Sequence, residues 1–511
     1  MWSKYLILGY LSALLSGFLF GWNLAVLNLP SYYIKCWIQA ITDTSGKNET
    51  ILSYCATDQT DNDFITSATN LKFAWISSIF CIGGMIGALS GGPISDKLGR
   101  RIGLIVIFNV YLISSLVLYI STINGVDSWQ VLFLGRILIG ISAGASTTVS
   151  TVYLTEIAPP KKESFFGVSF NLGIVCGSTF AQLFGLSYFL GTNDNWPFLF
   201  IVELALAGIG LIFILFGVES PVYLYEIKND SSKGELTNEK LYGHGNISVL
   251  ENRVSGQNIE KEVSTSNIFS KFKGIFQQKN ITMTLLIGIH LMMSQQFCGV
   301  NAFIFYSFDI LSQAGFSNDE ASISAVVLAS VLIIGTFLAM VLIKKYGRAT
   351  LMVIPMLILG ICCILFSILT VITEGMSSKP LDEQSSWLLP LLYISIFFIC
   401  LYNIAFAAGP GAIPWMFIPE ATTSDYVDIL QSICCLVNWL CQFLVGLIFP
   451  IVNEAIGSYV FLIFGIYCVV SSVVIYFYMP ETKGKSTYEV QEEMKRSGVI
   501  DRSIKDLFKT E

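Results

Sequence analysis

Twelve apolar segments of about 20 residues constrain this chain more than any other feature, because such a segment can cross a lipid bilayer as a helix. Within hydrocarbon every backbone N–H and C=O must be paired inside the protein, and a helix does this unaided. Only 13% of the 511 residues are charged, against about 25% in a soluble domain. The sequence therefore predicts an all-α polytopic membrane protein. The segments are residues 5–29, 72–94, 102–122, 129–153, 165–189, 198–218, 281–311, 322–343, 350–373, 387–417, 429–452 and 458–479.

Basic residues indicate which side of the membrane each loop occupies. Most of the 29 Lys and Arg lie at Lys4, in the loops 95–101, 154–164, 219–280 and 344–349, and after residue 479. The positive-inside rule makes these segments cytoplasmic, so both termini are predicted to be cytoplasmic. We expect a multi-pass protein of the plasma membrane. The run 5–29 is too long for a signal peptide's apolar core and no convincing cleavage site follows it. We expect it to remain as the first span.

The polar stretch 219–280 divides the spans into six and six. We predict an N-terminal six-helix bundle over 1–218 and a cytoplasmic linker with short helices over 219–280. A C-terminal six-helix bundle over 281–479 and a cytoplasmic tail over 480–511 complete the chain. The linker is rich in Ser, Asn, Lys and Glu, and it has no hydrophobic pattern long enough for a domain.

The outer loop 30–71 contains two features typical of an extracellular segment. Asn48-Glu-Thr is an acceptor sequence for N-glycosylation, so we expect a glycan at Asn48. Cys36 and Cys55 lie in the same loop and a disulfide between them is one possibility, whereas the other ten cysteines lie in or beside apolar segments. The histidines, His244 and His290, have no metal-binding spacing. We interpret His290 as a helix-packing residue and expect no metal, cofactor or nucleic acid.

A neutral polar stretch interrupts the seventh span. Gln295, Gln296 and Asn301 lie within a few residues of Gly299, and nothing from Ser294 to Tyr306 is charged. Polar groups at membrane depth are costly unless they face a cavity or a partner. Side-chain amides both donate and accept hydrogen bonds, as sugar hydroxyls do. The stretch therefore predicts a site for a neutral, hydroxyl-rich ligand.

The two halves of the chain repeat each other in sequence. Asp96-Lys-Leu-Gly-Arg-Arg101 follows the second span and Lys344-Lys-Tyr-Gly-Arg-Ala349 follows the eighth. Glu156 after span four corresponds to Glu420 after span ten. Duplicated bundles with a site between them are a transporter architecture.

These motifs resemble those of the sugar porter family of the major facilitator superfamily, and within it the facilitative glucose transporters of animals. The resemblance extends over nearly the whole chain outside the first loop, the central loop and the tail. Besides Asp96–Arg101, the motifs that support the resemblance are Gly135-Arg136 with Gly140, Glu219-Ser-Pro221, Gln295-Gln296 through Asn301, Gly409-Pro-Gly-Ala-Ile-Pro-Trp415, Asn438-Trp439 and Pro480-Glu-Thr-Lys-Gly484. The resemblance implies the major facilitator fold and transport of a hexose, without enzyme activity, by a protein that functions as a monomer in the lipid bilayer.

The resemblance also assigns residues to the sugar site. Asn438 and Gln442 are four residues apart and so share a helix face, and Trp415 follows a stretch of Gly and Pro that would break a helix beside a cavity. Its indole could cover the apolar face of a sugar ring, with Phe406 as a second wall. The predicted site residues are Gln295, Gln296, Asn301, Trp415, Asn438, Gln442, Asn171 and Phe406.

Proton coupling is the main mechanistic alternative. Proton-driven relatives carry an acid in the first span, where this chain has Asn23, which cannot titrate. Glu203, in span six, is a carboxylate within a span that could carry a proton, and it lies near the outer end of its helix. The sequence therefore favours uniport.

Charged residues at the cytoplasmic ends resemble the family's inner gate, in which arginines and glutamates pair across the two halves. They are Arg100, Arg101, Arg136, Glu156, Glu219, Arg348, Glu420 and Glu481. Several partners differ: Glu163, Val222, Val427 and Ala349 stand where the family has arginine, and Lys344 replaces an acid. Exposed pairs contribute about 0–1 kcal/mol each, but several losses together shift a conformational balance. We expect a resting state whose inner side is open more often than in relatives.

The identity of the sugar is left open by differences in the site. Asn171 replaces a glutamine, Leu332 an asparagine and Ala407 a glutamate, and Met292-Met-Ser294 replaces the Gln-Leu-Ser associated with glucose. The prediction is D-glucose first, with fructose or another hexose, proton–sugar symport, or a non-transporting sugar sensor as alternatives.

Overall fold

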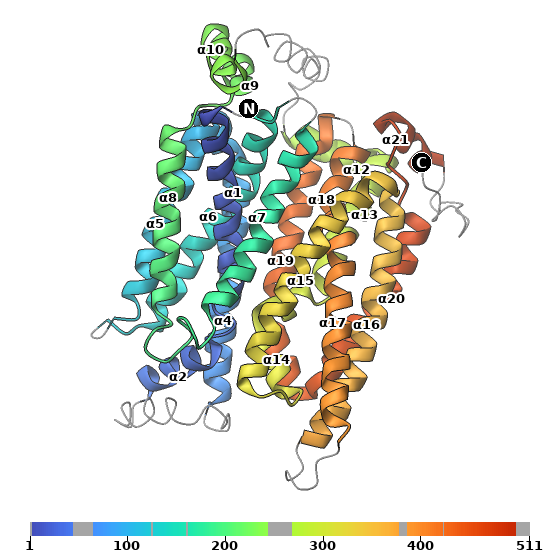
Figure 1. Ribbon diagram of the computed structural model, residues 1–511. Helices are drawn as coiled ribbons and strands as arrows, with labels where there is room; N and C mark the ends of the chain where they lie inside the picture. The colour runs from blue at the N-terminus through green and yellow to red at the C-terminus, as the bar shows by residue number, and fades with distance from the viewer. Residues whose placement is uncertain are drawn as a thin grey trace. The chain divides into compact units, whose positions relative to one another are not determined.

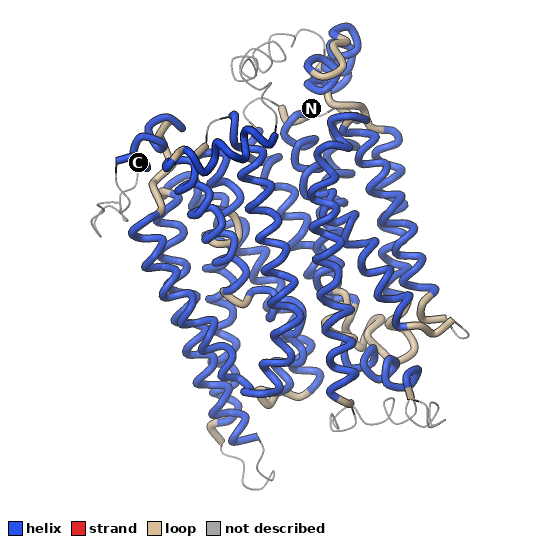
Figure 2. The backbone as a smooth tube through the Cα atoms, turned by 180° about the vertical axis from the view of Figure 1, so that it is seen from behind, coloured by secondary structure: helices blue, strands red, loops and turns tan. Residues whose placement is uncertain are grey.

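A computed structural model describes residues 3–43, 65–123, 126–159, 162–243, 268–377, 386–422 and 424–496, as helices joined by turns and loops (Figure 2). The chain divides into two compact units, Met1–Glu262 and Val263–Glu511. Eleven continuous apolar helical stretches are long enough to cross a bilayer, and the last, Tyr426–Tyr478, contains two helices. The described residues thus provide twelve crossings, six per unit, and the all-α prediction is confirmed.

Unit 1 contains six long helices, with bounds close to the predicted spans. Two further short helices, α9 (Pro221–Glu226) and α10 (Ser231–Tyr242), follow the last of them at the end of the unit where the chain begins (Figure 1). The short helix α2 (Ser31–Thr42) lies at the opposite end. The long helices are α1 (Lys4–Ala25), α4 (Ser67–Leu98), α5 (Arg100–Ile120), α6 (Trp129–Glu156), α7 (Glu163–Phe184) and α8 (Phe198–Phe216).

Glycines let the helices of unit 1 approach closely. A Cβ at Gly83 of α4 would collide with the backbone of α6, and one at Gly140 of α6 would collide with α4. Gly21 of α1 and Gly177 of α7 form the same kind of contact. In a membrane, where no hydrophobic effect drives helices together, this close packing supplies the attraction.

Unit 2 differs from unit 1 in that two of its spans are broken. One consists of α13 (Lys279–Phe297) and α14 (Val300–Gln313), and the other of α17 (Leu388–Ala408) and α18 (Ile413–Ala421). The unbroken spans are α15 (Asn318–Lys345), α16 (Arg348–Ser377), α19 (Ser424–Ile456) and α20 (Val460–Tyr478), and a 3-10 turn (Gly457–Tyr459) joins the last two. The short helices α12 (Ile268–Gln277) and α21 (Thr487–Arg496) pack at the end of the unit where α13 begins (Figure 1).

The linker and the tail contribute helices to both units. Helices α9 and α10 belong to unit 1, and α12 belongs to unit 2. The expected glycosylation residue Asn48 lies outside the described residues, as do His244 and Cys55. Cys36 is disulfide-bonded, and Cys55, the partner that the sequence offers as one possibility, is in the part of the loop that is not described.

Candidate functional site

The two helix breaks of unit 2 bring free backbone groups to the same place. Gly299, between α13 and α14, has φ +94°, a left-handed conformation that a residue with a side chain rarely adopts. The second break, Gly409–Ala412, follows the end of α17. Here the Gly411 N–H donates to Phe406 O at 2.8 Å, five residues back instead of the four of an α-helix. The carbonyls of Pro410 and Gly411 are consequently outside a regular helix and accept bonds from a side chain.

A continuous chain of amide hydrogen bonds connects these breaks to α19. Gln295 Nε2 donates to Pro410 O at 2.7 Å and to Gly411 O at 3.2 Å. Gln295 Oε1 accepts from Asn438 Nδ2 at 2.7 Å, and Asn438 Oδ1 accepts from Gln296 Nε2 at 2.9 Å. Asn301 Nδ2 donates to Gln296 Oε1 and so closes the chain on α14. We call Gln295, Gln296, Asn301 and Asn438 the amide chain.

All four side chains of the amide chain are buried and uncharged, with 3–5% of their surface exposed. A buried amide is tolerated when its donors and acceptors are paired. Here the side chains pair with each other and with the broken backbone. A ligand hydroxyl that both donates and accepts can replace any of these partners without leaving an amide unpaired. The arrangement therefore suits a neutral polyol and offers no charge to an ion.

The remaining predicted site residues are placed less closely. Gln442 lies one turn after Asn438 on α19 and is 5% exposed. It is not one of the four residues of the amide chain. Trp415 lies on α18 and Phe406 near the end of α17, both partly exposed. Asn171 lies on α7 in unit 1, so the structure does not place it relative to the amide chain.

A second polar chain joins α13 to α20 next to the amide chain. Ser294 Oγ donates to His290 O at 2.6 Å and contacts Ser471 Oγ at 2.6 Å, and Ser471 Oγ contacts His290 Nε2 at 3.1 Å. When Ser294 donates its one proton to His290 O, Ser471 donates to Ser294, and His290 Nε2–H then donates to Ser471. Sequence analysis missed these contacts, although it treated His290 as a packing residue.

A buried polar cluster also lies within the membrane-spanning part of unit 1. Asn23 Nδ2 donates to Glu203 Oε1 at 2.6 Å, and Arg136 Nη1 donates to Asn23 O at 3.1 Å and Oδ1 at 3.3 Å. Arg136 also donates to the carbonyls of Ile76 and Ser77, its guanidinium lies over the Phe80 ring, and its side chain is 1% exposed. Arg136 and Glu203 are charged residues within apolar spans, and this is the sequence signal for a buried polar cluster; both bond to Asn23.

This cluster corrects one prediction. Arg136 does not belong with the charged residues at the helix ends, because 20 residues of α6 separate it from Glu156, about 30 Å along the axis. Glu203 lies in the second turn of α8, near the end of the helix as predicted, and its side chain is fully buried against Asn23.

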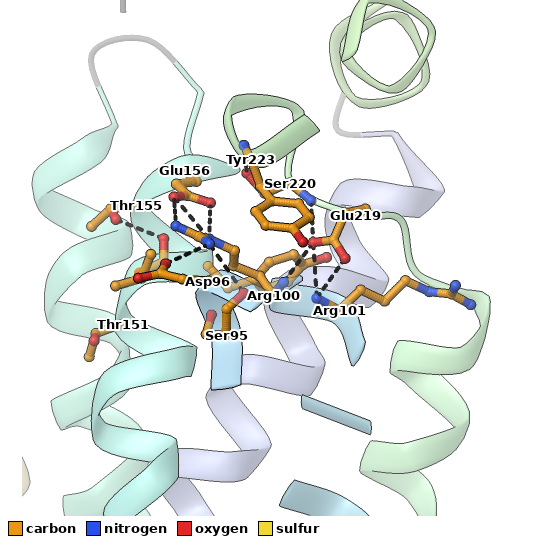
Figure 3. Close-up of polar contacts among 12 residues, drawn as sticks. Ser95, Asp96, Arg100, Arg101, Thr151, Thr155, Glu156, Glu219, Ser220 and Tyr223 are labelled. Carbon is orange, nitrogen blue, oxygen red and sulfur yellow. Dashed lines mark hydrogen bonds and ion pairs between the residues drawn. The ribbon is translucent and has the colours of Figure 1, made fainter. Parts of the chain in front are cut away.

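At the other end of α6, Arg100 organises a cluster of ion pairs (Figure 3). Its guanidinium contacts Glu156 at 3.0 Å and Asp96 at 3.0 Å, and it lies 4.9 Å from the centroid of the Tyr223 ring. Glu219 Oε1 accepts the backbone N–H groups of Arg100 at 2.9 Å and Arg101 at 3.0 Å. Glu219 thus caps the N-terminus of α5, where the helix dipole favours an anion.

The Arg101 side chain contacts backbone carbonyls at the end of α8 instead of a carboxylate. Its Nε donates to Ile214 O at 3.2 Å, and its Nη2 donates to Leu215 O at 2.6 Å. A cation at a helix C-terminus interacts favourably with the last carbonyls. Arg101 therefore connects the beginning of α5 to the end of α8.

Unit 2 repeats this geometry. Arg348 contacts Glu420 at 2.8 Å, and Glu481 accepts the backbone N–H groups of Arg348 at 2.6 Å and Ala349 at 3.2 Å. Arg348 Nη1 donates to Ile343 O at 3.0 Å, in place of the aspartate that Arg100 contacts. Each of these bonds joins residues of one unit, whereas the sequence predicted pairs across the halves.

Two of the residues that depart from the family pattern have described surroundings. Val222 is buried and Tyr225 packs against it, so this position contributes to packing in unit 1. Ala349 supplies its backbone N–H to Glu481 at 3.2 Å. The side chain of Glu163 lies outside the described set.

Twelve membrane-length helical spans in the described parts of the two units define a polytopic membrane protein, and two of the spans of unit 2 are broken beside uncharged amides. The chain matches the family model described as "Sugar (and other) transporter" over residues 10–494. Because the match spans nearly all of the chain, the protein belongs to this family of sugar transporters, which are not enzymes.

Sequence relatives have names consistent with this family. The chain is 29% identical over 485 residues to Facilitated glucose transporter protein 1 of Caenorhabditis elegans, covering 94% of this chain and 89% of the relative. It is 30% identical over 477 residues to solute carrier family 2, facilitated glucose transporter member 5 of Mus musculus (93% and 89% covered). Member 3 of Ovis aries is 30% identical over 484 residues (94% and 90% covered).

Solved structures share the fold at lower sequence identity. The inward-open xylose transporter XylE from E. coli superposes with a TM-score of 0.71 at 21% identity, covering 96% of this chain and 99% of that one. The proton:xylose symporter XylE bound to 6-bromo-6-deoxy-D-glucose gives 0.69 at 20%, covering 96% and 98%. The twelve-helix major facilitator fold predicted from the sequence is thereby confirmed.

Proposed function

We propose that this protein is a facilitative hexose carrier that takes D-glucose first, binds it at the amide chain of unit 2 and releases it by alternating access. The observation that carries the proposal is the uncharged chain from Gln295 through Asn438 to Gln296 and Asn301, closed on the Pro410 and Gly411 carbonyls. The names of the sequence relatives support a hexose.

The amide chain favours reversible binding of a sugar with moderate affinity over very tight binding. Without a ligand its amides bond to one another, so a sugar hydroxyl replaces an existing bond and does not fill an empty site. A net hydrogen bond contributes only about 0.5–1.5 kcal/mol, and such exchanges nearly balance. The resulting affinity is moderate, as a carrier that must release its cargo requires. Trp415 supplies an apolar surface for the ring in this proposal.

Asn23 supports transport without proton coupling, because its amide occupies the first-span position and is bonded to Glu203 and Arg136. The same contacts give the second candidate, proton–sugar symport, its specific support. Glu203 is a fully buried carboxyl group, and a membrane-embedded carboxyl is the usual element of a proton relay. We favour uniport because Glu203 is held by an amide and lies beside a permanently charged arginine.

Uptake by purified protein in liposomes tests the proposal. We expect saturable entry of labelled D-glucose that stops when the inner and outer concentrations are equal, with or without an inward pH gradient. Accumulation above the outer concentration under a pH gradient, abolished by Glu203→Gln, would establish symport instead. Absence of saturable entry for glucose, fructose and other hexoses would favour a sugar sensor.

The placement in the cell follows the charge distribution. We propose a plasma-membrane protein with both termini cytoplasmic, glycosylated at Asn48 and active as a monomer. The concentration of Lys and Arg in the loops that share a side with the termini supports this orientation. In it, the Arg100 and Arg348 clusters face the cytoplasm, where Arg100, Arg101, Glu156, Glu219, Arg348, Glu420 and Glu481 form the inner gate.

A further inference from the structure

The tail helix α21 packs against unit 2 and has a defined N-terminal cap. Ser486 and Glu489 form a reciprocal cap at its start: the Ser486 N–H donates to Glu489 Oε2 at 2.7 Å and the Glu489 N–H donates to Ser486 Oγ at 3.4 Å. Such a capping box marks a helix N-terminus. A helix of 10 residues is nevertheless marginal by itself in water, so its contacts with the bundle must hold it in place.

One face of α21 is buried against the bundle. Val490 is fully buried, Met494 is 5% exposed and Gln491 is 4% exposed. Valine and methionine account for this burial by their apolar surface, but a glutamine does not. A buried amide without partners costs about 1–3 kcal/mol, so the position of Gln491 depends on the bonds that it makes.

Gln491 is bonded through both ends of its amide. Oε1 accepts from Asn280 Nδ2 at 2.7 Å, and Nε2 donates to Thr284 Oγ1 at 3.1 Å and to Ala421 O. Asn280 is 8% exposed and Thr284 fully buried. The contact is therefore a closed polar node inside an apolar junction, and it involves no formal charge.

The node joins the ends of two broken spans. Asn280 and Thr284 lie in the first two turns of α13, the helix that carries Gln295 and Gln296 at its other end. Ala421 is the last residue of α18, which carries Trp415. The Gln491 amide therefore connects the half-helix that bears the amides to the half-helix that bears the aromatic residue.

We propose that Gln491 is a positioning residue that makes α13 and α18 move as one body, so that docking of α21 governs the rate of the transport cycle. Gln491 touches none of the predicted sugar-binding residues, so it acts on the conformational step and leaves sugar affinity unchanged. The kinetic part of this inference rests on the proposed function.

The test compares Gln491→Met and Gln491→Glu with Gln278→Met. Methionine keeps the volume and removes every polar bond. Glutamate keeps an acceptor for Asn280 but loses both donors. Gln278 is an exposed amide beside the same junction whose Nε2 donates to Tyr426 OH at 2.9 Å, and it serves as the matched control.

Hydrogen–deuterium exchange in detergent is read first, because it does not depend on transport. We expect the amides of 487–496 to exchange about tenfold faster or more in Gln491→Met, since loss of a buried bond of 1.4 kcal/mol corresponds to a factor of ten. Gln491→Glu should exchange at least as fast as Gln491→Met, because it buries a carboxylate with one oxygen facing the Ala421 carbonyl, and Gln278→Met should match the wild type. Unchanged exchange in Gln491→Met would overturn the proposal.

Initial rates of labelled D-glucose uptake in liposomes are read second. We expect the maximal rate of Gln491→Met to fall about fivefold or more while KM stays within about twofold, the pattern of an altered conformational step. A raised KM at an unchanged maximal rate would contradict the proposal. If the wild type takes up no hexose, the proposed function fails, whereas the exchange experiment still decides whether Gln491 docks the tail.

Discussion

At the scale of single residues, the most informative feature is that two sets of buried polar side chains in unit 2 are joined in short chains of hydrogen bonds. The amide chain is one, and His290–Ser471–Ser294 is another. Asn438 is central to the first because it bonds to both Gln295 and Gln296. Its replacement leaves two buried amides without their partners, which is more costly than the loss of one bond.

Asn438→Ala should therefore weaken hexose binding about tenfold or more, corresponding to roughly 1–3 kcal/mol for the groups left unpaired. Binding of D-glucose to purified protein and the KM of uptake both measure this. Asn453→Ala is the matched control, because Asn453 lies on the same helix and donates to Gln313 Oε1 at 2.7 Å in an exposed place. Equal effects of the two variants would contradict the assignment of the amide chain to the sugar site.

At the scale of helices, function is concentrated where the spans are broken. Gly299 ends α13 in a left-handed conformation, and a Cβ there would collide with the Phe464 ring. The break allows α14 to begin with Asn301 facing Gln296. The Gly409–Ala412 break supplies the carbonyls that Gln295 needs. An unbroken helix at the second place would satisfy its own backbone and leave Gln295 without these acceptors.

Gly299→Ala should lower the stability of the protein by about 1–2 kcal/mol from the left-handed backbone alone, and further from the clash with Phe464. Thermal unfolding in detergent measures the loss, and D-glucose uptake should fall with it. Gly208→Ala is the control, because Gly208 lies inside α8 with open space around it, where alanine favours the helix. A variant at Gly299 as stable as the one at Gly208 would show that the break does not depend on glycine.

At the scale of the whole molecule, the internal repeat is realised as two separate charge clusters of the same design. In each unit an arginine that begins a helix pairs with a glutamate that follows the corresponding span, and a second glutamate caps the helix. The two differ in burial. The Arg100 and Glu156 side chains are 8% and 11% exposed, whereas those of Arg348 and Glu420 are 14% and 26% exposed.

This difference predicts unequal costs for equivalent substitutions. Glu156→Gln should destabilise the protein by about 3–5 kcal/mol, because it leaves a buried arginine without its main counter-charge. Glu420→Gln should cost less, because water screens the more exposed pair. Unfolding midpoints of the two variants, measured side by side at low and high salt, decide the order, and a larger cost for Glu420→Gln would contradict it.

The sequence by itself determined the class and the spans, and it indicated the polar residues that the structure joins in the amide chain. Span length and charge placement follow from the bilayer, which admits few structures, so these features can be read from composition along the chain. The repeat and the motifs identified the family, and Gln295, Gln296, Asn301 and Asn438 were all named in advance.

Only the tertiary structure decided which of these side chains meet. The family resemblance groups Arg136 with the end clusters, yet it bonds to Asn23 in the buried part of unit 1. No local pattern in the tail indicates a role for Gln491, whose amide bonds to both α13 and α18. Partners separated by more than 100 residues are set by helix packing, and no local pattern records which face of one helix meets another. The neutral stretch from Gln295 to Asn301 thus predicts the chemistry of the proposed site. The hydrogen bonds that join this stretch to Asn438 and to the Pro410 carbonyl depend on the fold.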